Sequence, residues 1–187
     1  MKKYFLASAA AILLSAGAAQ ADTYLSILGG STWDPGLTVG AGKQGLDNGF
    51  NFGARVGRDL DEYGLQNFSA DVDLFYNQSH FSDLPGQHIR SLSSMADIVY
   101  HPQLGLPVDL YGGAGLGVIN TEYGNGAMSG SGSVLGWQML GGVEYPVSDD
   151  MKLFAEYRYQ NAHDVNVGGL PIGNTSNSLS VGMKFHM

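Results

Sequence analysis

The chain of 187 residues contains no cysteine, so no disulfide framework holds it together. It is also poor in basic residues, with nine Lys and Arg against seventeen Asp and Glu, a formal net charge of −8. Nucleic-acid binding needs clustered Lys and Arg to neutralise phosphates, which argues against a nucleic-acid partner. Beyond residue 21, no stretch approaches the ~18 uninterrupted apolar residues of a membrane-spanning helix. These absences exclude a disulfide-stapled domain, a nucleic-acid binder and a helical membrane protein.

The first 21 residues have the pattern of a secretory signal peptide. Two lysines near the start are followed by an apolar stretch over residues 5–16. An Ala-Gln-Ala run then ends at Ala21, which is the small-x-small pattern that signal peptidase cleaves. We therefore predict cleavage between Ala21 and Asp22, leaving a single domain over residues 22–187. Seven basic and seventeen acidic residues then remain, a formal net charge of −10.

Glycine and aromatic residues are abundant, with 28 Gly, ten Tyr and eight Phe. This composition suits strands and tight turns better than helices. From residue 22 onward the apolar residues recur with a period of two, which places alternate residues on opposite faces of a strand. The pattern predicts eight strands, at about residues 23–30, 50–57, 68–77, 90–100, 108–119, 137–145, 152–159 and 178–185.

The two faces of these strands differ in polarity. One face carries Leu, Val, Met, Ala and aromatic side chains with almost no charge. The other face carries many glycines and ten charged residues: Arg55, Asp71, Asp73, Asp97, Asp109, Glu144, Lys152, Glu156, Arg158 and Lys184. A soluble barrel turns its apolar face inward, whereas a membrane barrel turns that face toward hydrocarbon, which cannot solvate charge. The sequence therefore predicts an all-β fold, an eight-stranded antiparallel up-and-down transmembrane β-barrel.

The connections between the predicted strands alternate in length. Long, polar connections fall at about residues 31–48, 78–89, 120–132 and 161–177, and shorter ones at about 58–66, 101–107 and 146–150. Outer-membrane barrels have long extracellular loops and short periplasmic turns. We therefore expect four extracellular loops and both chain ends on the periplasmic side.

The interior of an eight-stranded barrel is just wide enough for side chains to fill. Charges held there, away from bulk water, must be paired. We expect the four cations of the second face to pair with some of its six carboxylates in a lumen charge network that stabilises the fold. The small residues Gly113, Gly115 and Gly117 should make room for long or aromatic side chains from across the lumen. The outward aromatic residues should form an interfacial girdle of Tyr100, Trp137, Tyr145, Tyr157, Tyr159 and Phe185.

Three short runs carry a family resemblance: Gly-Ala-Gly-Leu-Gly-Val at 113–118, Gly-Gly-Val-Glu-Tyr at 141–145 and Glu-Tyr-Arg-Tyr at 156–159. They resemble the outer-membrane β-barrel "porin family", which groups opacity-type proteins and OmpA-like surface antigens. The resemblance implies a Gram-negative outer-membrane surface protein with a structural or host-contact role, without enzymatic activity or cofactor. Family members typically end on an aromatic residue that the barrel assembly machinery reads. Here Phe185 is followed by His186 and Met187.

The implied partners are outer-membrane lipid and lipopolysaccharide, the barrel assembly machinery and, through the loops, a host or surface ligand. Two other functions stay open: a lipid A-modifying barrel enzyme and a narrow, low-conductance channel. A lipid A deacylase would need a serine nucleophile with a histidine base. The nearest stretch, around His163, lacks the His-x-Ser-Asn order of those enzymes, and we expect His163 to lie in a loop. No metal site is expected, although His80 and His88 are close in sequence.

Overall fold

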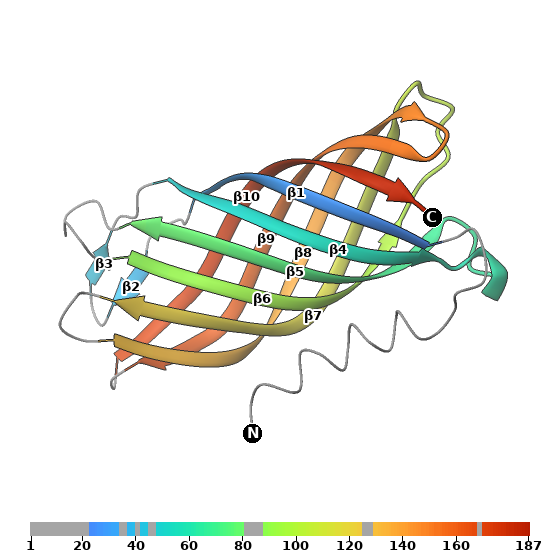
Figure 1. Cartoon of the computed structure of the whole chain (residues 1–187). Coiled ribbons are helices and arrows are strands. Elements are labelled where there is room, and N and C mark those ends of the chain that lie inside the picture. Colours follow the sequence, from blue (N-terminus) through green and yellow to red (C-terminus); the bar gives the residue numbers. More distant parts are fainter. Residues whose placement is uncertain are drawn as a thin grey trace.

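The computed structural model describes residues 23–33, 37–39, 42–44, 48–80, 88–124, 129–167 and 170–187. Eight long strands follow one another in chain order around a closed antiparallel barrel, because β1 pairs with both β4 and β10 (Figure 1). They are β1 (Thr23–Trp33), β4 (Gly49–Asp59), β5 (Phe68–His80), β6 (His88–Tyr100), β7 (Asp109–Gly124), β8 (Ser129–Ser148), β9 (Met151–Val167) and β10 (Leu170–His186). The prediction of an eight-stranded up-and-down barrel is confirmed. No helix in these ranges is long and apolar enough to cross a membrane.

The two ends of the barrel differ. At the turn end, β1 begins, β10 ends and the connections are short, one of them containing the 3-10 helix η1 (Asp61–Tyr63) (Figure 1). At the opposite, loop end, a small hairpin of β2 (Leu37–Val39) and β3 (Gly42–Gln44) extends the sheet beside β10. By the general rule for outer-membrane barrels, the turn end faces the periplasm.

Several strands are longer than the sequence pattern indicated. Most of the expected loop at 120–132 is strand, because β7 runs to Gly124 and β8 starts at Ser129. Most of the expected loop at 161–177 is also strand, because β9 runs to Val167 and β10 starts at Leu170. The predicted strand ends at these two places are therefore wrong, and the long polar connections are for the most part extended β-hairpins. Outside a membrane both faces of a strand meet water, so the apolar alternation is lost while the backbone ladder continues.

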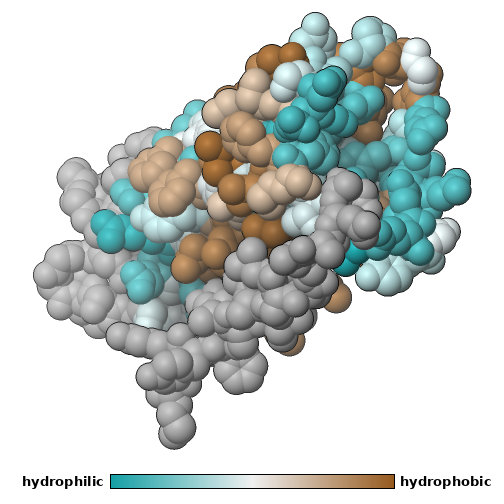
Figure 2. Space-filling model, turned by 45° about the vertical axis from the view of Figure 1, so that its right-hand side comes forward, coloured by the Kyte–Doolittle hydropathy of each residue, from teal (hydrophilic) through white to brown (hydrophobic). Residues whose placement is uncertain are grey.

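The wall of the barrel turns its apolar face outward. Ile27 is 45% exposed, whereas its neighbour Ser26 points inward and is 1% exposed. Along β4, Phe52 is exposed and Arg55 is buried. Figure 2 shows hydrophobic side chains gathered over the middle of the wall, with hydrophilic ones toward the ends. This is the arrangement of a membrane barrel, with an apolar band facing lipid.

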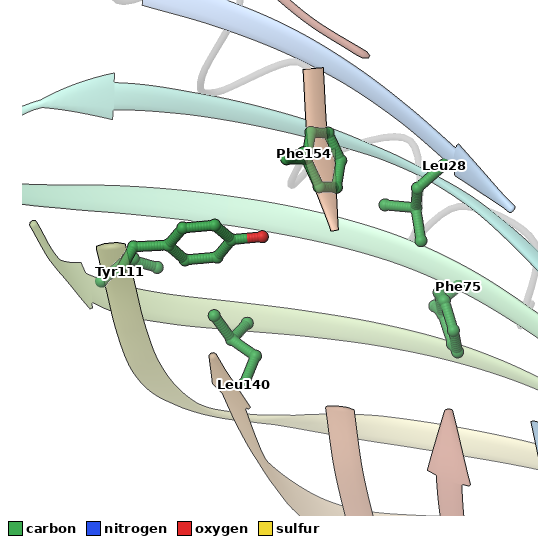
Figure 3. Packing of buried hydrophobic residues seen from close by; sticks show 6 residues of the cluster. Leu28, Phe75, Tyr111, Leu140 and Phe154 are labelled. Atoms are coloured by element: carbon green, nitrogen blue, oxygen red, sulfur yellow. The ribbon is translucent and has the colours of Figure 1, made fainter. Parts of the chain in front are cut away.

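Apolar side chains also pack inside the barrel, together with the charges. Figure 3 shows this interior cluster, which consists of Leu28, Phe75, Val99, Tyr111, Leu140 and Phe154. The aromatic rings lie over glycines of neighbouring strands. A Cβ added at Gly142 would lie 2.6 Å from Tyr111 Cζ, and one added at Gly182 would lie 2.5 Å from Phe154 Cζ. The rings therefore occupy the space that a side chain on the next strand would need.

The three glycines singled out in β7 are used in the same way. Gly113, Gly115 and Gly117 lie beneath side chains of the neighbouring strand β6, which are Val99, Asp97 and Met95 respectively. A Cβ at any of the three positions would collide with these groups. The atoms nearest to these three positions thus belong to the adjacent strand β6, and not to residues across the lumen as expected from the sequence.

Substitution of two consecutive glycines in β8 tests this packing. Gly142→Val should lower the free energy of unfolding by about 1–3 kcal/mol, because its side chain would overlap the Tyr111 ring. Gly141→Val is the matched control, since its Cβ faces outward and would meet only Tyr111 O at 3.6 Å. Urea unfolding of the refolded barrel in micelles measures both. Equal effects of the two substitutions would contradict the role assigned to Gly142.

Candidate functional site in the barrel interior

Two arginines lie at the centre of the lumen, Arg55 from β4 and Arg158 from β9, with side chains 5% and 1% exposed. Arg55 Nη2 is 3.1 Å from Asp73 Oδ2 and 2.8 Å from Glu156 Oε2. Arg158 Nη2 is 2.6 Å from Asp73 Oδ2 and 2.7 Å from Glu156 Oε1. Because β5 and β9 lie on opposite sides of the ring of strands, the Asp73–Arg158 pair crosses the lumen. Both guanidinium groups are charge-assisted donors to both carboxylates.

A second group of charges lies nearer the turn end. Lys184 Nζ is 3.1 Å from Glu144 Oε1, and both side chains are buried. Lys152 Nζ is 2.9 Å from Asp109 Oδ2 and 3.4 Å from Glu144 Oε2, in a more exposed position. Solvent screens the Lys152 pairs more strongly, so they contribute less to stability than the buried ones.

Tyr24 connects the two groups of charges. Its hydroxyl donates to Asp71 Oδ1, and the ammonium group of Lys184 lies 3.9 Å from the centre of its ring. Asp71 Oδ2 is in turn 3.6 Å from Arg55 Nε. Tyr24 therefore contributes both a hydrogen bond and a cation–π contact. Its place on the inward face followed from the period of two, but its role as a connector was not predicted.

Asp97 differs from the other nine charged residues of the lumen. No Lys or Arg in the described ranges lies within ion-pair distance of it, and Gln138 Nε2 donates to its Oδ1 at 2.6 Å. Gln160 Nε2 donates to Gln138 at 2.9 Å and to Ser93 at 3.0 Å, and Asn77 donates to Gln160 at 3.3 Å. A layer of neutral amides thus continues the polar lining of the lumen. The charge pattern of the sequence did not predict this layer, although Gln138 occupies an inward position of the alternation.

Two cavities adjoin the charges. One of about 230 Å³ opens at the turn end, and His101, Lys152 and Lys184 are among the residues that line it. A deeper one of about 10 Å³ is bounded by Asp71, Lys184 and other buried groups. The deeper cavity is large enough for a single water molecule at most.

His101 lies just after β6, in the connection at the turn end, where it is partly buried. Its ring stacks against Tyr111 with the centroids 5.8 Å apart, and its backbone N–H donates to Asn67 O at 2.8 Å. Burial, reinforced by the nearby positive charge of Lys184, lowers the pKa of His101 to about 4. The imidazole is therefore neutral in the folded protein at neutral pH.

The aromatic residues expected to form a girdle all lie on the barrel wall. Near the turn end, Tyr100 is 44% exposed and its ring packs on Phe68 at 5.0 Å, and Tyr145 is 58% exposed. Farther toward the loop end, Trp137 packs on Tyr159 at 5.4 Å. The remaining two members are Tyr157 and Phe185, also on outward positions of their strands. An anchoring role at the membrane interface stays a prediction for all six.

The cleavage site and His163 are the remaining predicted positions. The expected cleavage site at Ala21 and Asp22 lies outside the described residues. His163 was expected in a loop, but its backbone belongs to β9. This strand continues beyond the part of the sequence that shows apolar alternation. Among the described residues, no group of three or more His, Asp or Glu is placed to hold a metal ion.

Comparison with known proteins identifies the kind of barrel. The family model of the outer membrane protein beta-barrel domain matches residues 5–185. The solved structure of Neisserial surface protein A is similar, with a TM-score of 0.66 and 22% identity over 89% of this chain and 99% of that chain. OprG from Pseudomonas aeruginosa gives a TM-score of 0.58 at 16% identity, over 90% of this chain and 98% of that one.

The N-terminal β-barrel domain of Pseudomonas aeruginosa OprF gives a TM-score of 0.53 at 17% identity, covering 90% of this chain and 100% of that chain. At these identities the structural likeness shows the fold alone. No curated protein matches the chain significantly. The family match and the fold together confirm the predicted location in the Gram-negative outer membrane, where the wall of the barrel is surrounded by lipid.

Arg158→Ala tests the contribution of the central charges. Removal of this guanidinium leaves Asp73 and Glu156 with Arg55 as their one shared cation in the described ranges. The free energy of unfolding should fall by about 3–5 kcal/mol, as for other broken buried pairs. The control is Arg58→Ala, which removes a half-exposed pair with Glu62 and should cost less than about 1 kcal/mol. Unchanged thermal unfolding of Arg158→Ala would exclude a stabilising network.

The pH dependence of stability tests the environment of His101. Its pKa is about 4 in the folded protein and about 6.5 when unfolded, so the unfolded state binds the extra proton. The neutral imidazole therefore stabilises the fold fully above pH ~6.5, and this contribution is lost as pH falls toward ~4. In His101→Gln the decline between these pH values should be shallower than in the wild type. Parallel curves from urea unfolding at pH 4.5, 5.5 and 7 would contradict this.

Proposed function

We propose that this chain, which belongs to the outer membrane protein beta-barrel domain family, is a non-enzymatic surface protein with a filled interior. Its role is to stabilise the envelope and to present its loop end to a host or surface partner. The barrel assembly machinery inserts it, reading a C-terminal strand whose last aromatic residue is Phe185.

The observation that carries the proposal is the ion pair that crosses the lumen. Asp73 and Arg158 approach to 2.6 Å with side chains 0% and 1% exposed, and Glu156 and Arg55 complete the same layer. An ion passing through the barrel would have to break these pairs in a low-dielectric interior, at a cost of several kcal/mol. This supports an interior that is closed by side chains.

A closed lumen leaves the wall and the loop end as the surfaces that meet other molecules. At the loop end, β7 and β8 extend to Gly124 and Ser129, and the hairpin of β2 and β3 adds to the edge of β10. Extended hairpins of this kind present a backbone framework above the membrane. This supports contact with a partner at the loop end.

Conductance separates the filled barrel from a narrow channel. The refolded wild-type protein in planar bilayers should give no resolved current steps, because the Asp73–Arg158 pair blocks the centre. The double variant Asp73→Ala/Arg158→Ala removes both charges together and should introduce small steps. The control Arg58→Ala/Glu62→Ala removes the half-exposed pair and should remain silent. Stable steps from the wild type would favour the channel.

A strain without the gene tests the envelope role against lipid A chemistry. It should become more sensitive to detergents, and the gene on a plasmid should restore resistance. The mass of its lipid A should not change, because the proposed role involves no catalysis. A lost or gained acyl chain would favour the enzyme, and unchanged detergent sensitivity would count against a structural role.

A further inference from the structure

The larger cavity at the turn end, called the vestibule from here on, is lined by charges of both signs. Asp59, Asp61 and Asp109 line it together with Lys152 and Lys184, and its volume is about 230 Å³. Pockets for drug-sized molecules measure ~300–1,000 Å³, so a ligand of the vestibule must be small. Carboxylates and ammonium groups in one small space suit neither a simple anion nor a simple cation.

The positive charges lie on one side of the vestibule. Lys152 of β9 and Lys184 of β10 are direct partners in the ladder, an arrangement in which like charges repel. Glu144 holds both ammonium groups, at 3.1 Å from Lys184 and 3.4 Å from Lys152. Lys152 also contacts the half-exposed Asp109, and Lys184 also lies against the ring of Tyr24. Within the described part of the chain, these contacts use two of the three N–H groups of each ammonium, so one donor of each remains for a ligand.

Negative charges form another side, which is fixed by hydrogen bonds. Asp59 ends β4 and Asp61 lies in η1. Asp61 Oδ1 accepts from the backbone N–H of Asn67 at 3.0 Å, and Asn67 Oδ1 accepts from Gln103 Nε2 at 2.7 Å. Asn67 has a φ of 66°, and it is the one non-glycine residue with a positive φ in the described ranges. Backbone held in this conformation is concentrated at functional sites, so this acidic side has the character of a preorganised binding surface.

The separation of the two sides sets the length of the ligand. In the ring of strands, β4 lies two positions from β10 and three from β9, about 10–14 Å at the usual strand spacing, and the charged side chains reach inward from there. A free amino acid carries both of its charges on one carbon atom, whereas an extended dipeptide separates them by about 7 Å. The peptide group of such a ligand also finds hydrogen-bonding partners, since His101 and Gln103 line the vestibule.

We propose that the vestibule binds a short periplasmic peptide, of about the size of a dipeptide, through both of its charged ends. The carboxylate of the peptide accepts hydrogen bonds from Lys152 and Lys184, and its ammonium group donates to Asp59 and Asp61. Charge-assisted hydrogen bonds at both ends account for the paired lysines and the fixed acidic side together. Because the turn end faces the periplasm, this site is independent of the proposed role of the loop end.

Isothermal titration calorimetry of the barrel, extracted from outer membranes in mild detergent, tests the proposal with L-alanyl-L-alanine as the probe. The wild type should bind this dipeptide at millimolar or lower concentration. The N-acetylated dipeptide lacks the ammonium group, and the dipeptide amide lacks the carboxylate. Each blocked form should bind at least about tenfold more weakly than the free dipeptide, because it loses the hydrogen bonds between charged groups at one end.

Variants on both sides of the vestibule complete the test. Asp61→Asn removes the charge but keeps an oxygen for the N–H of Asn67, and Lys152→Gln removes the more exposed ammonium; each should weaken binding of the free dipeptide at least about tenfold. The matched control Glu62→Gln makes the same change one residue along η1, where the side chain pairs with Arg58 outside the vestibule lining, and should bind as the wild type does. A gel shift between unheated and boiled samples shows that each variant is folded. A wild type without binding, a blocked dipeptide that binds as tightly as the free one, or equal affinities of Asp61→Asn and Glu62→Gln would each overturn the proposal.

Discussion

The fold depends on one constraint: hydrocarbon offers no hydrogen-bonding partner to the peptide backbone. Each N–H and C=O group inside the membrane must be paired by the protein itself, which a sheet achieves only when it has no edge. Pairing of β1 with β10 removes the edge and closes the barrel. Closure in turn determines which residue types suit each face of the strands. The outward positions become apolar, and the inward positions become a narrow compartment that side chains of eight strands share.

That compartment explains why charge and glycine occur on the same face. Arg158 can reach Asp73 across the lumen because small residues such as Gly142 and Gly182 let the aromatic rings lie flat against the wall. The Arg158 guanidinium itself lies 4.0 Å from the centre of the Phe75 ring. Paired charges, amides and aromatic rings together occupy the interior, and each depends on the others for its position.

The sequence predicted the barrel and the face of each strand because a period of two is visible wherever one side meets lipid. It failed for the ends of β7 to β10, where water on both sides removes that contrast while the hydrogen-bonded ladder persists. The ten lumen charges could be placed on one face, but their pairing could not be derived. Which carboxylate faces Arg55 or Lys184 depends on the stagger of the strands, and Asp97, without an ion-pair partner in the described ranges, looks identical to its neighbours in sequence.

The pairs that cross the lumen also set an order on assembly. Arg158 and Asp73 are 85 residues apart, and Arg55 and Glu156 are 101 apart, so neither pair exists until β9 has joined the earlier strands. An unfinished sheet of β1 and β4 to β8 carries Arg55 without Glu156 and Asp73 without Arg158, besides two open edges. Such an intermediate is unfavourable in lipid, because the backbone groups at its two edges have no hydrogen-bonding partner. Full neutralisation of the interior therefore needs the last strands of the chain, and contacts between residues so far apart in sequence are slow to form.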